Sequence, residues 1–346
     1  MKHLPLHFTR NNGIVDETID RLITLVGPVH HPEIVREIIL AALKAGQEDE
    51  ERADLKLINT TVKEMRFTAK VFGPYRNKRK VTVFGSARTD PDENIYQLAR
   101  DFGAKLAQAG YMVITGGGGG IMHAVNEGAG PGHSFGVNIR LPFEQHPNPA
   151  IEGTPRLITY KYFFNRKVAF LKEASAVALF PGGFGTLDEA METLTLLQTG
   201  KHQIIPLVFI DEPGGSYWTK WVRFFEDELL AQGYISETDF HFFSRYDSVD
   251  AAVGHIVQFY HRFHSHRYVG EKLVLRLSSG IGPECVRQLN YEFRDMLTPG
   301  GGVYLSGPLE EETDEPDIVH LPRLVVDFNR MSFGRLRRLI DAVNSC

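Results

Sequence analysis

Hydrophobic residues at helical spacing dominate the first part of the chain. Apolar positions recur three and four residues apart over 15–23, 34–45 and 55–72, a pattern that predicts three amphipathic helices. Gly73-Pro74 then interrupts the pattern, because both residues disfavour a continuing helix. We therefore expect a helical N-terminal segment, residues 1–78.

From residue 79, short apolar runs alternate with glycine turns and helical patterns. The predicted strands are 81–84, 111–115, 134–139, 157–158, 176–180 and 204–210, and the predicted helices lie around 96–106, 121–128, 162–174, 189–197, 217–230 and 249–263. Strands that alternate with helices predict an α/β fold with a mostly parallel sheet and helices on both faces. We assign this domain to residues 79–265.

The remaining residues, 266–346, form a predicted small α+β segment. Its strands are expected at 272–277, 302–305 and 324–328, and its helices at 284–297 and 333–343. The acidic stretch 310–317 is typical of a solvated loop. Four histidines near the end of the preceding domain (255, 261, 264 and 266) are expected on a solvated face of one late helix and its end. Oligomerisation or regulation is the expected use of this segment.

Composition and charge exclude several classes of protein. Of 346 residues, 42% are hydrophobic and 23% charged, as in ordinary globular proteins, and the net charge of −5 gives no electrostatic reason to expect nucleic acid as a partner. No apolar run approaches the roughly 20 residues that span a bilayer, so no membrane association is expected. The two cysteines are too few for a disulfide framework or a standard zinc site. We expect a cytoplasmic protein with no metal and no cofactor.

Three glycine-containing loops follow predicted strands: Gly85-Ser86, the run Gly116–Gly120, and Gly182–Thr186. The carboxyl ends of parallel strands meet at one edge of a sheet, where ligands bind. Glycine turns that open helices present backbone N–H groups to anions, so a phosphate-bearing ligand is expected there. Ser86, Gly117, Gly118 and Met122 are candidate contacts on the first two loops.

Two common nucleotide sites are disfavoured. A P-loop motif is absent, and a nicotinamide site would need an acidic residue where the second strand ends in Thr115. A dinucleotide interpretation of five consecutive glycines is therefore weak.

Arg166 and Glu189 flank the strand 176–180 and are candidate catalytic residues. Arg166 shares a helical stripe with Phe163 and Phe170, which suits a ligand site, although it also suits an arginine that extends to the surface. Glu189 follows Thr186 by three residues, so a capping box explains it equally well. If both side chains face one cleft, a carboxylate beside a sugar and an arginine beside a phosphate suit cleavage of a glycosidic bond.

A basic run, Lys78-Arg79-Lys80, immediately precedes the first strand of the sheet. Such a run is usually a solvated approach to a strand. A role in steering phosphates is the alternative.

The glycine loops and the Arg-Lys pair together resemble the LOG (LONELY GUY) family of nucleoside 5'-monophosphate phosphoribohydrolases, once labelled lysine decarboxylase-like. The resemblance covers roughly residues 80–262, and the stretches 141–145 and 195–201 resemble the longer bacterial branch of the family. It rests on Thr115-Gly116-Gly117-Gly118-Gly119-Gly120-Ile121-Met122, on Arg166-Lys167, and on Pro181-Gly182-Gly183-Phe184-Gly185-Thr186-Leu187-Asp188-Glu189.

The resemblance implies a Rossmann-like fold, a homodimer or higher oligomer, and hydrolysis of a nucleoside monophosphate to free base and ribose 5-phosphate without a cofactor. Cytokinin precursors are among the implied substrates. The family's catalytic pair falls on Arg166 and Glu189. Its binding positions fall on Glu144, Lys167, Gly182, Gly183, Gly185, Thr186 and Thr195. Two other functions stay open, a carrier resembling molybdenum-cofactor-binding proteins and a non-catalytic nucleotide sensor.

Overall fold

The computed structural model describes residue 8 and residues 10–142, 146–312 and 315–346. The chain divides into two compact units, Met1–Arg66 and Phe67–Cys346. The first unit contains two helices and most of a third: α1 (Ile14–Val26), α2 (Pro32–Glu48) and α3 (Arg52–Phe72). Ile19 of α1 and Leu40 of α2 are buried, and Arg36 pairs with the buried Asp16. The predicted N-terminal helices are thus present.

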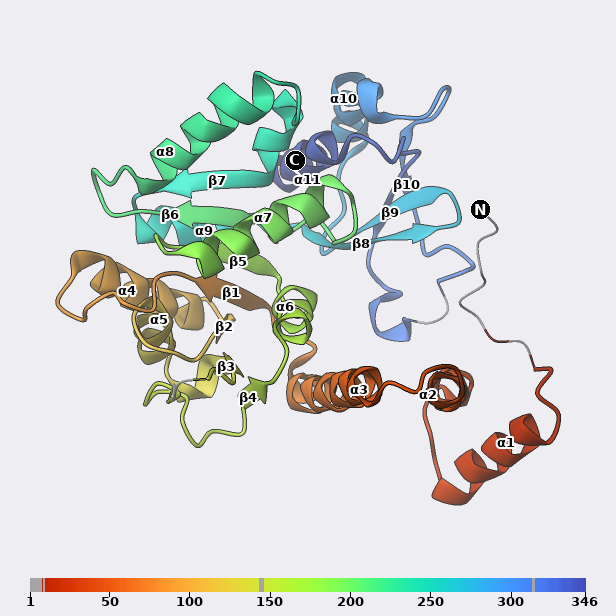
Figure 1. Cartoon of the computed structure of the whole chain (residues 1–346). Helices are drawn as coiled ribbons and strands as arrows, with labels where there is room; N and C mark the ends of the chain where they lie inside the picture. The colour runs from red at the N-terminus through yellow and green to blue at the C-terminus, as the bar shows by residue number, and fades with distance from the viewer. Residues whose placement is uncertain (1–7, 9, 143–145, 313–314) are drawn as a thin grey trace. The chain divides into compact units, whose positions relative to one another are not determined.

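The second unit is built around a seven-stranded sheet in which every neighbouring pair of strands is parallel. The strands follow the order β4-β3-β2-β1-β5-β6-β7 (Figure 1). Their bounds are β1 (Lys80–Phe84), β2 (Met112–Thr115), β3 (Ser134–Ile139), β4 (Leu157–Tyr160), β5 (Ala176–Leu179), β6 (Leu207–Ile210) and β7 (Phe243–Tyr246). The predicted Rossmann-like α/β fold is confirmed, although β7 was not among the predicted strands.

Helices cover both faces of this sheet because alternate side chains of each strand point to opposite sides. Val81 and Val83 of β1 join one apolar cluster with α4, α5 and α9. Thr82 and Phe84 face α6 instead, where Thr82 Oγ1 donates to Phe170 O at 3.0 Å and the rings of Phe84 and Phe170 lie 4.8 Å apart. The helices are α4 (Asn94–Gln108), α5 (Ile121–Ala129), α6 (Phe163–Lys172), α7 (Phe184–Gln198), α8 (Tyr217–Phe224) and α9 (Val249–Phe259).

The strand order changes direction between β1 and β5. The chain lays down β1 to β4 toward one side of the sheet and then returns to place β5 on the other side of β1. A crevice forms at such a switch point, at the carboxyl ends of the strands. The loops after β1 and β5 border this point.

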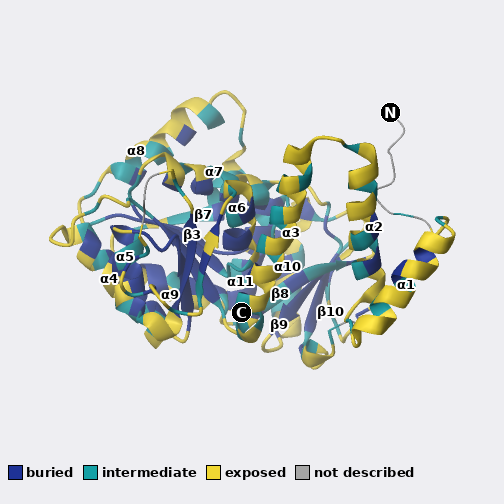
Figure 2. Ribbon diagram, turned by 60° about the horizontal axis from the view of Figure 1, so that its bottom comes forward, coloured by how far each residue is buried: buried dark blue, intermediate teal, exposed yellow. Residues whose placement is uncertain are grey.

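A second sheet follows, with four antiparallel strands in the order β10-β11-β9-β8. Its elements are β8 (Phe263–Val269), β9 (Lys272–Leu277), α10 (Pro283–Glu292), β10 (Val303–Ser306), β11 (Arg323–Val326) and α11 (Phe333–Ser345). The predicted α+β segment is therefore present. Figure 2 shows the strands of both sheets largely buried and the outer faces of the helices exposed.

Two expectations about the C-terminal part were wrong. Residues 263–269 form strand β8 rather than the end of a helix, and His266 within it is buried, with Nε2 accepting a hydrogen bond from Ile204 N at 3.1 Å. The acidic stretch is not simply a solvated loop, because Glu312 is 4% exposed and forms ion pairs with Arg276 and Arg323. In both cases tertiary contacts supply partners that local sequence does not reveal.

The two cysteines form a disulfide between Cys285, near the start of α10, and Cys346, which follows α11. Two cysteines are too few to predict a disulfide framework from the sequence, and this pairing was not predicted. Disulfides are uncommon in reducing compartments, so the cross-link weighs against the cytoplasmic location, which stays a prediction. None of the helices in the described ranges is long and apolar enough to cross a membrane.

Candidate functional site

Three loops meet at the switch point of the parallel sheet. Ser86, after β1, donates its backbone N–H to Pro181 O at 3.0 Å, which joins it to the loop after β5. The carbonyl oxygen of Ser86 accepts a hydrogen bond from Ile121 N at 2.9 Å, which joins it to the end of the glycine run. The convergence predicted from the sequence is therefore present.

Glycine is required where these loops touch. A Cβ atom on Gly182 would collide with the Thr186 side chain and approach the Gly85 backbone to 3.0 Å. Gly183 and Gly185 differ, since a Cβ atom there would meet nothing within 4 Å and both residues are exposed. These two glycines leave open space in front of the first turn of α7, where backbone N–H groups lack helical acceptors and attract anions.

Glu189 does not form a capping box with Thr186, which was the alternative explanation of this residue. Helix α7 begins after Gly183, has no side-chain cap, and contains Thr186 as a buried residue of its first turn. Because Thr186 lies inside the helix, Glu189 occupies the second turn and cannot complete a capping box. Its carboxylate is free for another role.

Glu189 is a buried carboxylate with few partners. Its side chain is 8% exposed, Oε1 lies 3.4 Å from Lys167 Nζ, and Oε2 has no hydrogen-bond partner among the described residues. Burial raises its pKa from 4.5 to about 7, against the opposing effect of Lys167; Glu192 and Asp188 raise it further and Arg166 lowers it. The carboxyl group is therefore partly ionised near neutral pH, a condition suited to proton transfer.

Arg166 is oriented toward the same site rather than along the surface. Its Nε donates to Val137 O of β3 at 2.8 Å, and its guanidinium lies 4.9 Å from the Phe170 ring centre. A Cβ atom on Gly116 would collide with its Nη2, so glycine at that position makes room for the guanidinium. Burial lowers the pKa of Arg166 to about 10, and the nearby Glu189 opposes this shift. The arginine stays charged at neutral pH.

A cleft of about 850 Å³ lies between these groups. Eight residues predicted as site residues line it: Ser86, Met122, Arg166, Gly182, Gly183, Gly185, Thr186 and Glu189. Its wall also includes the apolar side chains of Ile139, Leu141 and Phe163. The cleft thus combines a helix N-terminus, a buried acid, a buried cation and an apolar surface.

Other predicted residues lie elsewhere. The backbone groups of Gly117 and Gly118 form hydrogen bonds with buried side chains of the protein itself. Gly117 N donates to Thr115 Oγ1 at 3.0 Å, and Gly118 O accepts from Asn148 Nδ2 at 3.0 Å. Thr195 lines a separate apolar cavity of about 150 Å³.

Two further residues that were predicted to bind substrate are not among the described residues that line the cleft. Lys167 borders another cavity and contacts Glu189 from outside the cleft. Glu144 lies outside the described residues.

Sequence reasoning missed several residues of the cleft. Tyr217 of α8 lines it and donates its hydroxyl to Gly182 O at 2.6 Å, while Trp221 lies one turn further along the same helix and Phe184 is 93% exposed. Gly116 was visible within the glycine run, but its contact with Arg166 was not. Tyr217 had no local signal, because only the fold brings α8 to the loop after β5.

Comparison with known proteins identifies related sequences. Residues 119–256 match the family described as "Possible lysine decarboxylase". A cytokinin riboside 5'-monophosphate phosphoribohydrolase of Mycobacterium marinum is 28% identical over 169 residues, which cover 49% of this chain and 87% of that protein. A protein of the same name from Arabidopsis thaliana is 26% identical over 163 residues, covering 46% of this chain and 73% of the plant protein.

A third relative is a pyrimidine/purine nucleotide 5'-monophosphate nucleosidase of Escherichia coli K12. It is 32% identical over 129 residues, which cover 34% of this chain and 28% of the bacterial protein.

Within the described ranges, no group of three His, Cys, Asp or Glu residues is arranged to hold a metal ion.

The raised pKa of Glu189 predicts a pH-dependent stability difference in Glu189→Gln. A carboxyl group whose pKa rises from 4.5 to about 7 on folding holds its proton more tightly in the folded state. Its burial costs little below pH 4.5, and the cost grows as the pH rises through 7. We therefore expect the substitution to raise the free energy of unfolding by about 2–3 kcal/mol more at pH 8.5 than at pH 5.

Urea denaturation at the two pH values measures this difference. Glu152→Gln, at an exposed position, is the matched control and should show no comparable pH dependence. Equal effects of Glu189→Gln at both pH values would contradict the assignment of a raised pKa.

Proposed function

We propose that this chain is a LOG-family enzyme and that its parallel-sheet domain hydrolyses the N-glycosidic bond of nucleoside 5'-monophosphates; the family match over residues 119–256 supports this proposal. The products are the free base and ribose 5-phosphate. The observation that carries the proposal is the buried carboxylate of Glu189, which shares one cleft with the open N-terminus of α7 and with Arg166. The names of the relatives from Mycobacterium marinum and Escherichia coli support the same reaction class.

The 5'-phosphate is proposed to bind at the start of α7. Gly183 and Gly185 leave the approach open, and the N–H groups of the first helical turn carry partial positive charge. Thr186 adds a hydroxyl group at the same point. This position fixes one end of the substrate and leaves the sugar near the second turn of α7, where Glu189 lies.

Glu189 is proposed to stabilise a cationic sugar, and Arg166 is proposed to hold the substrate. As the bond between C1' and the base nitrogen breaks, its electron pair leaves with the base and the ribose acquires oxocarbenium character. The ionised Glu189 carboxylate stabilises that positive charge in a low-dielectric site. Arg166 holds the substrate through its terminal nitrogens, because its Nε is already bound to Val137 O.

Water completes the reaction by adding its oxygen to C1'. Glu189 accepts one proton of that water and later releases it to solvent, while the departing base, which keeps the electron pair of the broken bond, takes up one proton from solvent. A pKa near 7 allows this carboxylate to accept and release the proton at neutral pH. The apolar surface of Met122, Ile139, Leu141 and Phe163 is the proposed contact for the base, which for a cytokinin precursor carries an apolar substituent.

The first test compares Glu189→Gln and Arg166→Ala with the unchanged protein. The substrates are AMP, GMP, CMP, UMP and isopentenyl-AMP, and chromatography measures the free base released. We expect base release from at least one substrate and a decrease in kcat of at least about 100-fold in either variant, since each removes a charge that acts in the transition state. Glu152→Gln should retain full activity. A fully active Glu189→Gln enzyme would rule out the proposed role.

A pair of glycine substitutions tests whether the position of Arg166 matters. A Cβ atom on Gly116 would displace the Arg166 guanidinium and the Met122 sulfur, which are flexible side-chain ends, so Gly116→Ala should fold. We expect it to lose at least about tenfold in kcat/KM, as small displacements in an active site do.

Gly119→Ala on the same loop is the matched control, because a Cβ atom there comes only to 3.4 Å from Ala87 O. It should change kcat/KM less than twofold. Equal activity of the two variants would contradict the requirement for an undisplaced Arg166.

We also propose that the active form is a homodimer. Phe163, Phe164 and Val168 are about half exposed on α6 although they are apolar, which provides a surface for a second copy beside the cleft. Sedimentation velocity measures the state directly, and Val168→Glu should shift the protein to monomers. A chain that is monomeric at micromolar concentration would contradict this proposal.

A further inference from the structure

A second, larger cavity lies at the amino ends of the parallel strands, whereas the cleft lies at their carboxyl ends. Its volume is about 1180 Å³. It is bounded by the segments that lead into β1, β5 and β6, by α6 and α7, and by the C-terminal sheet with the segment Glu315–Ile318. The basic run singled out in the sequence forms part of this boundary through Lys78 and Arg79.

The lining of this cavity is strongly basic in a protein of net charge −5. It contains seven Lys and Arg residues but three Asp and Glu residues. Three of the cations, Lys167, Lys172 and Arg276, pair with carboxylates. The other four have no carboxylate partner among the described residues; they are Arg76, Lys78, Arg79 and Lys201. Such a concentration of positive charge in a concave surface attracts anions.

Arg79 is held in position before any ligand arrives. Its guanidinium carbon lies 3.5 Å from the centre of the Tyr260 ring, and its Nη2 donates to His264 O at 3.4 Å. Tyr260 is fixed in turn, because its hydroxyl donates to Ser175 O at 2.5 Å. A cation that is already ordered loses little conformational entropy when it binds an anion.

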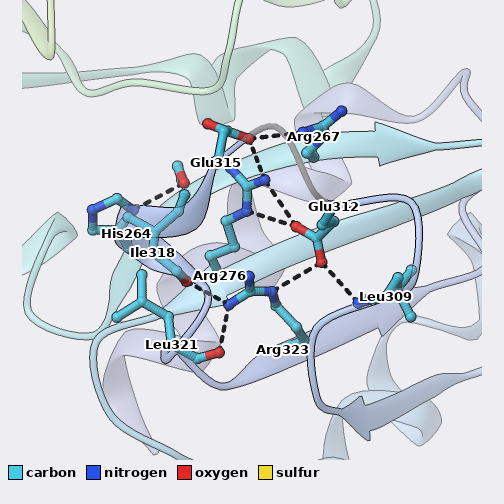
Figure 3. Close-up of polar contacts among 10 residues, drawn as sticks. His264, Arg267, Arg276, Leu309, Glu312, Glu315, Ile318, Leu321 and Arg323 are labelled. Atoms are coloured by element: carbon cyan, nitrogen blue, oxygen red, sulfur yellow. Dashed lines mark hydrogen bonds and ion pairs between the residues drawn. The ribbon is translucent and has the colours of Figure 1, made fainter.

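The opposite wall belongs to an ion-pair network of the C-terminal sheet (Figure 3). Arg276 of β9 donates to Glu312 Oε1 through Nε at 3.0 Å and Nη2 at 2.8 Å, and to Glu315 Oε2 at 2.5 Å. Arg323 of β11 donates to Glu312 Oε2 at 3.0 Å, while Arg267 donates to Glu315 Oε2 at 2.8 Å. Glu315 is therefore engaged by arginines of its own sheet and does not neutralise the cations across the cavity.

We propose that this cavity binds a small ligand carrying two or more phosphate groups and that its occupancy affects the catalytic cleft through Lys167. The four cations without a carboxylate partner outnumber the one remaining lining carboxylate, Asp317, and they lie on one concave surface large enough for a small molecule. Lys and Arg are the side chains that bind phosphate oxygens most strongly. The binding part of the proposal is independent of the proposed enzymatic function.

The coupling part rests on the proposed function. Lys167 borders this cavity, yet its Nζ lies 2.8 Å from Asp188, 2.6 Å from Glu192 and 3.4 Å from Glu189. A phosphate that draws Lys167 away removes a positive charge from Glu189, while Asp188 and Glu192 stay beside it and Arg166 remains on the cleft side. The Glu189 carboxyl group then holds its proton more tightly, so the acid limb of the pH–rate profile moves to higher pH.

Isothermal titration calorimetry of the full chain with inorganic pyrophosphate tests the binding. We expect the double substitution Arg79→Gln and Lys201→Gln to weaken binding at least tenfold. Lys220→Gln removes one exposed charge outside both cavities and is the charge control; it should bind as the unchanged protein does. Gly183→Asp places a carboxylate at the start of α7, where a side chain meets no other atoms, and repels phosphate from the cleft. Binding should persist in this variant.

Circular dichroism establishes that each variant is folded, and Lys201→Gln alone replaces the double variant if that one does not fold. Absence of binding to the unchanged protein, unaltered binding in the folded cavity variant, or loss of binding confined to Gly183→Asp would each overturn the site.

The pH–rate profile with and without saturating pyrophosphate tests the coupling. The calorimetric titration of Gly183→Asp shows which of the two cavities the pyrophosphate fills. An acid limb that stays in place would overturn the coupling and leave the binding result standing. An enzyme inactive on every nucleotide would instead contradict the proposed function, and calorimetry would still decide the binding.

Discussion

Close contact between three loops is the constraint on which the site depends. Ser86 binds the loop after β5 through its N–H group and the start of α5 through its carbonyl oxygen. Gly182 allows this approach because any side chain there would collide with Thr186. Without that contact, the first turn of α7 and the guanidinium of Arg166 would not border one cleft, and the burial that raises the pKa of Glu189 would be lost.

The sequence predicts the parallel-sheet domain well because its signals are local. Apolar runs such as 176–180 end in glycine turns that can be recognised within a few residues, although some contacts that require those glycines, such as that of Gly116 with Arg166, arise only in the fold. The same locality explains why Arg166 and Glu189 were identified: both flank one strand, so a single structural assumption places them together. Tyr217 was missed because its hydrogen bond to Gly182 O joins positions 35 residues apart, and nothing near Tyr217 distinguishes it.

In the C-terminal part, by contrast, the local sequence does not predict which charged residues are buried. Glu312 belongs to an acidic stretch whose composition is typical of solvent-exposed loops, yet its carboxylate is buried between Arg276 and Arg323 from two neighbouring strands. A buried charge is tolerated only when its partners are in place, and those partners are set by strand register. Lys78-Arg79-Lys80 is similar, since composition does not distinguish the buried Lys80 from the exposed Lys78 beside it.

Helix α6 separates the two cavities, and its neighbouring residues Arg166 and Lys167 border different ones. Successive residues of an α-helix are turned by about 100°, so this division depends on the rotational phase of the helix. An insertion or deletion of one residue between Phe163 and Arg166 would turn the pair away from both cavities, even if the helix still packed on the sheet. A transplanted cleft would therefore function only with the phase of this helix preserved.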